Sequence, residues 1–425
     1  MRFVYAFLPL SWRPGKLARD TMILTTGLGL RALAQALVFL IVARVLGSQG
    51  YGAFSAALAI AGVWVHFCGL GGHVILMRDV AQDPASFPES WALTLAVLGV
   101  GTIPVLILYL ASARWLLPGI PWILVASLGL GELVFWPFAN AAACAYQGFE
   151  RMGRSARLML APVLLRLVAA VLLLAAVFQR PGTDCLILWG GLYAGASLLG
   201  ALYAHYRVRH DLGRPLWAGW RGLGAFVGAG LPFALIGGAH KLYVDADKFL
   251  LARLATLEVT GHYSAGYRLV DLAFLPLHGL LNAAVPRLFR AGAGGVVRTL
   301  RAVGPMFGPP VGYAAAAVGG IFVFAPLIPR LLGAEYAESA LVVRWLLLLP
   351  LLSLPRLLLQ RVLGVSNAQK LGMIAVMAGA MVNAGLNLWW IPLWSWRGAV
   401  VSTYAAELAM ILILSGMIGS RIWKK

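Results

Sequence analysis

The chain has 425 residues, of which 61% are hydrophobic and only 12% are charged. Soluble domains carry about 25% charged residues, so this composition excludes an ordinary water-soluble globular protein. The formal net charge of +19 would suit a nucleic-acid-binding protein, but retention of Lys and Arg on the cytoplasmic side of a membrane produces the same excess. We therefore expect a membrane protein with no nucleic-acid partner.

Apolar runs of about 20 residues, the length that crosses roughly 30 Å of hydrocarbon, recur along the whole chain. Backbone polar groups in lipid must be satisfied within their own segment, so each run is predicted to be a helix. The expected fold class is an all-α integral membrane protein with about twelve transmembrane helices. The twelve predicted spans are residues 20–43, 53–76, 91–113, 122–145, 158–178, 186–206, 222–244, 262–285, 303–328, 340–361, 370–391 and 398–420.

The segments between the spans differ in positive charge. If the N-terminus is cytoplasmic, the cytoplasmic segments hold most of the Lys and Arg residues that lie outside the spans, including the basic linker at 205–221. Positive charge is retained on the cytoplasmic side, so both termini are predicted to be cytoplasmic.

The two halves of the chain resemble each other. A shift of 209 positions brings identical residues together, Ala43 and Arg44 onto Ala252 and Arg253, Gly52 onto Gly261, Ser55 onto Ser264, and Arg78 onto Arg287. Such matches at one offset indicate an internal duplication of a six-helix unit. Because six spans return the chain to its starting side, the copies have parallel topology. The sequence predicts two six-helix lobes, residues 1–210 and 211–425, which face each other across a central cleft.

Charged residues inside the spans are the candidates for function. Each costs about 2.5 to 3.5 kcal/mol near the middle of the bilayer and needs a partner, a wet cavity or a position at a helix end. The cations within spans are Arg31, Arg166, Lys241, Arg268 and Arg356, and the acids are Glu132, Asp271 and Glu407. The balance is cationic, which favours an anionic substrate.

Two spans carry polar residues on one helix face. Gln35 follows Arg31 by one turn, and the 209-residue offset brings Arg31 onto His240, beside Lys241. In the eighth span, Tyr267, Asp271, His278 and Asn282 follow at helical spacings. Guanidinium groups suit phosphate oxygens, so we predict a site for an anionic head group. Its candidate substrate contacts are Arg31, Gln35, Lys241, Tyr267, Arg268 and Asn282, with Arg78 at the cytoplasmic entrance.

The same cations have a structural interpretation. Arg268 could be neutralised by Asp271, and Arg78 by Asp79. Arg166 and Arg356 are expected nearer the cytoplasmic leaflet, where a long side chain can reach the interface. These alternatives stay open at the level of sequence.

The acids Glu132, Asp271 and Glu407 are candidates for coupling transport to H⁺ or Na⁺, since a carboxylate in a low-dielectric site can exchange its charge during a cycle. An interhelical hydrogen bond or ion pair is the alternative. No catalytic residue, metal ligand or further cofactor is expected. No Lys is followed by Ser or Thr, so a Walker A loop is absent, and the short loops leave no soluble domain for an enzyme.

Several stretches resemble a known family. "VARVLGSQGYGAFSAALAI", "DADKFLLARLATLEVTGHYSAGYRLVD" and "NAGLNLWWIPLWSWRGAVVSTYAAE" are similar to Wzx-type O-antigen and polysaccharide flippases of the multidrug/oligosaccharidyl-lipid/polysaccharide exporter superfamily. The resemblance implies a multi-pass protein of the bacterial inner membrane that moves undecaprenyl-pyrophosphate-linked glycans between leaflets by alternating access, with ion coupling. Implied partners are the lipid-linked glycan, membrane lipids and the polysaccharide polymerase machinery.

Two other functions are weighed against this one. A drug exporter of the same superfamily should have an acidic or apolar cavity, whereas the cations within these spans outnumber the acids. A membrane-embedded enzyme of glycan assembly should have a sizeable external loop with an acid and a base, and none is evident.

Overall fold

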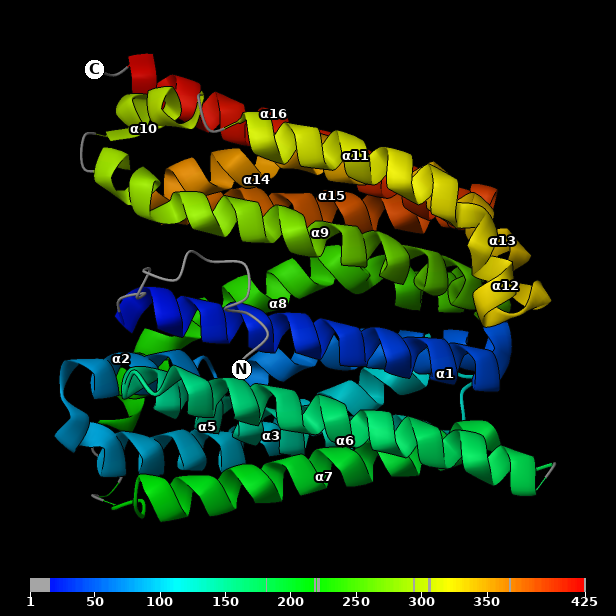
Figure 1. Ribbon diagram of the computed structural model, residues 1–425, viewed down its shortest axis with the longest axis horizontal. Helices are drawn as coiled ribbons and strands as arrows, with labels where there is room; N and C mark the ends of the chain where they lie inside the picture. Colours follow the sequence, from blue (N-terminus) through cyan, green and yellow to red (C-terminus); the bar gives the residue numbers. More distant parts are fainter. Residues whose placement is uncertain are drawn as a thin grey trace, which may run out of the picture.

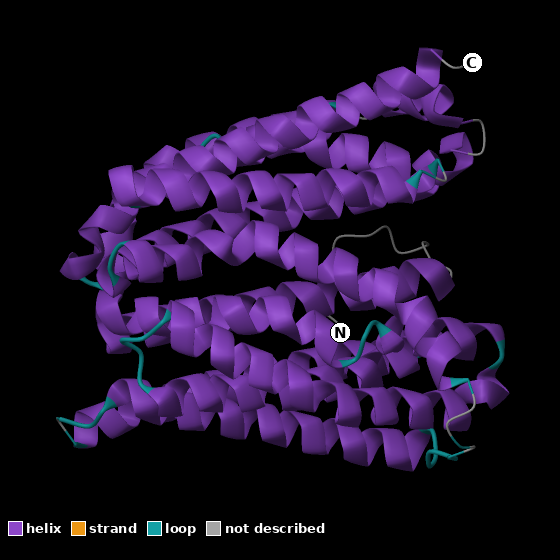
Figure 2. Ribbon diagram, turned by 180° about the vertical axis from the view of Figure 1, so that it is seen from behind, coloured by secondary structure: helices purple, strands orange, loops and turns teal. Residues whose placement is uncertain are grey.

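The computed structural model describes residues 16–180, 182–217, 219, 222–292, 295–304, 307–366 and 368–423. Within these ranges the side chains of residues 16–25, 28, 282–287, 289–292, 302–303, 369 and 421–423 are not described. Every regular element in the described ranges is a helix (Figure 2). The expected all-α class is confirmed for this part of the chain.

The helices follow one another in the order shown by the colours of Figure 1. Their bounds are α1 Lys16–Cys68, α2 Gly72–Gln82, η2 Pro84–Ser86, α3 Phe87–Leu116, α4 Trp122–Gly129, η3 Leu130–Phe135, α5 Trp136–Gly148, α6 Met152–Gln179, α7 Cys185–Asp211, α8 Leu223–Leu254, α9 Leu257–Gly292, α10 Gly295–Val303, α11 Gly308–Phe324, η5 Ala325–Leu327, α12 Ile328–Leu332, η6 Ala334–Tyr336, α13 Ala337–Leu346, α14 Leu349–Val365, α15 Gln369–Trp394 and α16 Trp396–Trp423. The element η3 is a single π-helical turn between α4 and α5.

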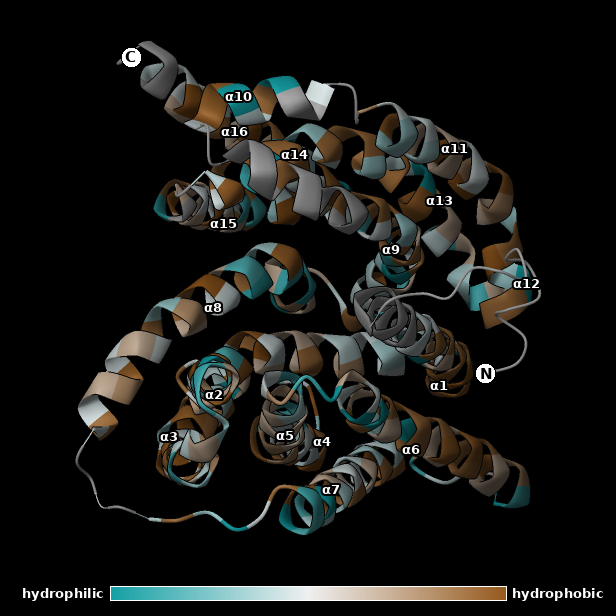
Figure 3. Ribbon diagram, turned by 60° about the vertical axis from the view of Figure 1, so that its left-hand side comes forward, coloured by the Kyte–Doolittle hydropathy of each residue, from teal (hydrophilic) through white to brown (hydrophobic). Residues whose placement is uncertain are grey.

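The long helices are suited to lipid. Among the described residues, nine helices are long and apolar enough to cross a membrane, and up to ten if the bent pair Ala334–Leu346 and Leu349–Val365 is one span. On α6, Leu164, Val168, Val171 and Leu172 are 40–56% exposed at helical spacing, and hydrophobic colour predominates along this helix (Figure 3). Such an exposed apolar stripe is the face that a lipid-embedded helix presents. The protein is a multi-pass membrane protein, although the count of twelve spans is not confirmed.

The helix α1 turns back on itself at Gly47, where φ is 68° and ψ is 176°. This backbone conformation is available essentially only to glycine. In one straight helix Arg31 and Val65 would lie about 50 Å apart, yet both line the same cavity. The predicted first and second spans are therefore the two arms of α1, residues 16–46 and 48–68.

The first seven helices and the last eight lie on opposite sides of the molecule in Figure 1, with α8 between them. Figure 3, a different view, also separates α2, α3, α5, α6 and α7 from α9, α14, α15 and α16. Helix α1 packs on α8 and α9 as well as on α6. The division into lobes 1–210 and 211–425 stays a prediction.

The two halves meet through equivalent residues. Ser55 on α1 donates a hydrogen bond to Ser264 on α9, 2.9 Å between hydroxyl oxygens and 209 residues along the chain. A Cβ at Gly52 would clash with the carbonyl of Leu257, and a Cβ at Gly261, its counterpart, would clash with that of Ser48. The 209-residue offset also relates Ser48 to Leu257, so the two contacts are reciprocal, as across a twofold axis. We call Gly52, Ser55, Gly261 and Ser264 the glycine–serine seam.

A second set of contacts joins the halves near Gly47. Tyr336 donates to the carbonyl of Ala43 at 2.8 Å, and the Ser48 N–H donates to the Glu335 carboxylate at 3.3 Å. Residues 334–336 form the short turn η6. These contacts hold the two halves together at the end of the molecule where α1 turns back.

Candidate functional site

A cavity of about 380 Å³ lies between the two halves. Helices α1, α5, α6 and α7 and the turn η3 contribute its lining on one side, and α8 and α9 contribute it on the other. The charged residues that line it are the cations Arg31, Arg166, Lys241, Lys248 and Arg268 and the acids Glu132, Asp245 and Asp271. The cavity therefore carries more positive than negative charge.

On the side of the first seven helices, an ion pair is built around η3. The π-helical turn widens the helix and carries Glu132. The Arg166 guanidinium donates to this carboxylate at 2.6 Å and also to the Ser197 hydroxyl at 3.0 Å. Tyr193 donates to the same oxygen of Glu132 at 2.5 Å. Arg166 is thus neutralised within the wall of the cavity rather than at the membrane surface.

On the opposite side, α8 carries a second neutralised cluster. Asp245 accepts from Lys241 at 2.5 Å and from Lys248 through its other oxygen. Lys248 also lies 5.0 Å from the centroid of the Tyr267 ring. Asp247, which points elsewhere, accepts from Tyr263. Two lysines share one cavity carboxylate, so this cluster keeps a net positive charge.

Arg31 and Arg268 differ from these cations, because neither forms an ion pair or a hydrogen bond with any described residue. Arg31 extends from the first arm of α1, with its guanidinium carbon 5.4 Å from the centroid of the Trp136 ring. Arg268 is on α9, and no ion pair joins it to Asp271 although both line the cavity. The neutralisation of Arg268 by Asp271 is not observed. One unpaired guanidinium from each half faces the same space.

Not all of the other predicted site residues line the cavity. Gln35 and Asp271 line the cavity, but Tyr267 is buried beside it and contacts Lys248. Arg78 pairs with Asp79 at 2.8 Å, is half exposed and lies outside the cavity. Asn282 lies outside the residues whose side chains the structure describes.

The acid Glu407 belongs to a separate buried cluster. It accepts from Arg356 at 2.6 Å, from Tyr243 at 2.6 Å and from Ser353 at 2.8 Å. Arg356 and Glu407 are 6% and 2% exposed. The Arg356 side chain does not extend to the protein surface, because its guanidinium is held in an ion pair between α14 and α16.

Several residues that line the cavity were not among the predicted site residues. Asp245 and Lys248 lie beyond the predicted seventh span, which ends at residue 244, whereas α8 continues to Leu254. Trp136 and His66 also line the cavity. Single aromatic and His residues are common in membrane helices, so nothing in the sequence marks either residue as part of a site.

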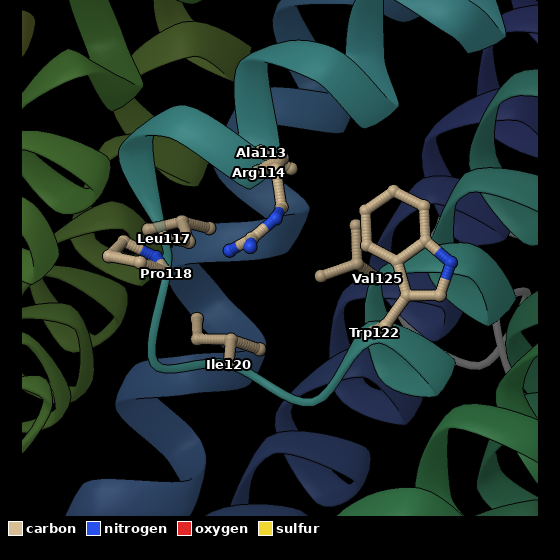
Figure 4. Close-up of a pocket in the computed structure, with 7 residues that line it drawn as sticks. All are labelled: Ala113, Arg114, Leu117, Pro118, Ile120, Trp122 and Val125. Atoms are coloured by element: carbon tan, nitrogen blue, oxygen red, sulfur yellow. The ribbon is translucent and has the colours of Figure 1, made fainter.

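Another hollow lies at the turn between α3 and α4. Figure 4 shows the Arg114 guanidinium directed between Leu117 and the Trp122 ring. The hollow has a volume of about 480 Å³, and Arg114 is the one charged residue in its described lining. It contains none of the predicted site residues.

The arrangement defines a class of protein. A multi-pass helical protein whose two halves enclose a cationic cavity has the architecture of a membrane transporter. The chain belongs to the polysaccharide biosynthesis protein family, whose model matches residues 17–291, more than half of its length. No curated protein sequence matches the chain.

Solved structures share the fold over nearly the whole chain. An inward-facing multidrug resistance MATE family transporter of the MOP superfamily has a TM-score of 0.72 at 16% identity, covering 92% of this chain and 95% of its own. The lipid II flippase MurJ, in an inward closed conformation, has a TM-score of 0.76 at 11% identity, covering 94% and 87%. An outward-facing MATE structure has a TM-score of 0.62 at 16% identity, covering 95% and 96%. Each of these neighbours is a transporter or flippase, and this chain shares their fold. The family match confirms the predicted resemblance to polysaccharide biosynthesis proteins.

Proposed function

We propose that this protein is a flippase that moves undecaprenyl-pyrophosphate-linked oligosaccharide, such as an O-antigen or polysaccharide repeat unit, across the bacterial inner membrane by alternating access. Family membership in polysaccharide biosynthesis supports a glycan substrate. One structural neighbour is a flippase of lipid II, which is itself lipid-linked. We further propose that both termini are cytoplasmic, so that the Gly47 end faces outward, and that the halves 1–210 and 211–425 move as lobes.

One observation carries the proposal: Arg31 and Arg268 converge on one cavity, and neither has a carboxylate partner among the described residues. An unpaired guanidinium in a low-dielectric site needs an anion, and its fork matches phosphate oxygens. A diphosphate presents several such oxygens, so one arginine from each half can bind it together. The neighbouring lysines raise the local positive potential while Asp245 holds them in place.

Ion coupling is assigned to Asp271 within this proposal. Glu132 and Glu407 each form a close ion pair with an arginine, at 2.6 Å in both cases. Asp271 lines the cavity and has no ion-pair partner among the described residues. A carboxylate free of a fixed cation can bind and release H⁺ or Na⁺ during a cycle.

The test is transport by purified protein in proteoliposomes. A fluorescent undecaprenyl-diphosphate glycan is incorporated, and the fraction protected from a membrane-impermeant quencher is followed with time. Arg31→Ala and Arg268→Ala should each slow transport about tenfold or more, because each removes charge-assisted hydrogen bonds to the diphosphate. Arg114→Ala, at the hollow of Figure 4 and away from the cavity, is the matched control and should transport normally.

The rival function is tested in the same vesicles. A multidrug antiporter would move a cationic dye and leave the glycan lipid in its original leaflet. That result, with arginine variants unchanged, would overturn the proposal. The excess of cations in the cavity argues against a cationic cargo.

A further inference from the structure

A small side chamber opens next to the central cavity, and we propose that it is a subsite for an acylamino substituent on the sugar nearest the diphosphate. This inference rests on the proposed flippase function and adds a determinant of glycan selectivity. The chamber has a volume of about 80 Å³. It lies entirely among helices of the first half, α1, α2, α3 and α5.

Polar side chains without partners line this chamber. His66, His73 and Asn140 are partly buried and form no hydrogen bond with any described residue. Thr94 is satisfied locally, since its hydroxyl donates to the Ser90 carbonyl at 2.7 Å. The nitrogen and oxygen atoms of these three side chains are not fully buried, so their hydrogen-bonding capacity is open to a molecule in the chamber. Three such groups around one small space favour a polar occupant.

The chamber shares a wall with the arginine site. Val65, His66 and Trp136 line both the chamber and the central cavity. The Arg31 guanidinium lies over the Trp136 ring, and its central carbon is 5.4 Å from the ring centroid. Because Trp136 lines both spaces, a diphosphate held by Arg31 would place its first sugar close to the chamber.

The size of the chamber limits what can enter it. A water molecule occupies about 30 Å³ in the liquid, so 80 Å³ admits a group of a few heavy atoms and excludes a whole sugar ring. The ring of a neutral His offers one donor and one acceptor, and the Asn amide offers both. An amide substituent also presents an N–H and a carbonyl, whereas a single hydroxyl would leave part of the chamber unfilled.

The experiment compares two probes that differ at one position of the sugar. Prenyl-diphosphate–N-acetylglucosamine carries an acetamido group at C2, and prenyl-diphosphate–glucose carries a hydroxyl there. Binding of each to the full-length protein in nanodiscs is measured by calorimetry. We expect the wild type to bind the acetamido probe about 5- to 10-fold more tightly, because a satisfied hydrogen bond in a buried site has about this effect.

Two variants change the chamber without touching the arginines. Asn140→Leu keeps the branching and the number of side-chain heavy atoms and removes the amide, and His73→Phe removes the imidazole nitrogens. Both should weaken binding of the acetamido probe about 5- to 10-fold and change binding of the glucose probe less than twofold. Gln35→Leu, in the central cavity only, is the matched control and should leave the ratio between the probes unchanged.

The outcomes are separable from those of the flippase test. Equal binding of both probes by the wild type, or an equal loss for both probes in Asn140→Leu, would overturn the subsite. Failure to bind either probe, together with no effect of Arg31→Ala, would contradict the proposed function instead. Melting temperatures of the variants exclude misfolding as the cause of any loss.

Discussion

At the scale of single residues, the charged side chains within the membrane spans fall into those that form ion pairs and those that do not. Arg166 and Arg356 are held by Glu132 and Glu407 in hydrogen-bonded ion pairs. An ion pair buried in this way is retained because removing one partner leaves an isolated charge in a low-dielectric interior. Arg31 has no such partner in the part of the chain that the structure describes, and it faces the cavity.

The pair formed by Arg356 and Glu407 is predicted to be structural. Glu407→Gln leaves the buried guanidinium unpaired and should destabilise the protein by about 3 to 5 kcal/mol. The double variant Arg356→Met with Glu407→Gln removes both charges and should recover much of this loss. Thermal unfolding in detergent measures both. If the double variant is stable but moves glycan without dependence on the ion gradient, Glu407 has the coupling role after all.

Part of the site could be predicted from these residues alone. Arg31, Lys241 and Arg268 interrupt apolar runs, and the cost of burying charge makes each conspicuous. Gln35 follows Arg31 by one helical turn. Pairing could not be predicted, because Glu132 on η3 and Arg166 on α6 meet only where both elements pack against α7 and α1. Nor could the side chamber, since its polar residues come from four helices and no spacing in the sequence relates them.

At the scale of elements, the break in α1 depends on one residue. Gly47 has a positive φ of 68°, and a Cβ there would approach the Glu335 carboxylate. The hydrophobic pattern indicated one span on each side of Gly47. It could not predict that the chain reverses there without a loop, because the reversal depends on backbone dihedral angles and not on the spacing of apolar residues.

Substitution of Gly47 tests this dependence. Gly47→Val should destabilise the protein by about 1 to 3 kcal/mol, because a β-branched residue is strained at this φ and ψ. The control is Gly29→Ala in the first arm of α1, where a Cβ meets nothing within 4 Å and where alanine favours the helix by about 0.5 to 1 kcal/mol. Melting temperatures of the two variants should move in opposite directions. Equal melting temperatures would contradict the assigned role of Gly47.

At the scale of the whole molecule, the halves are joined near Gly47 by the glycine–serine seam and by the contacts of Glu335 and Tyr336. Alternating access requires these contacts to separate when the cavity opens on that side. The duplication predicted from the 209-residue offset agrees with the reciprocal form of the seam. The 209-residue offset makes Ser55 and Ser264 equivalent positions, but it does not predict that the two side chains are in contact.

A covalent link across the seam should stop transport. The variant with Ser55→Cys and Ser264→Cys, in a background where Cys68, Cys144 and Cys185 are replaced by alanine, can form a disulfide because the serine oxygens lie 2.9 Å apart. Oxidation should abolish flipping in proteoliposomes, and a reductant should restore it. Each single-cysteine variant should be insensitive to oxidation. Normal transport by the oxidised double variant would show that the seam stays closed throughout the cycle.

The reciprocity of the seam has a consequence for the ancestry of the chain. Gly52 and Gly261 each leave room for the backbone of the opposite half at the same register. A surface that fits its own copy in this way is what a half-length protein would need to form a twofold dimer. In such an ancestor one glycine codon would have supplied both sides of the contact. In a fused chain the two glycines are encoded separately, so each contact can change without the other.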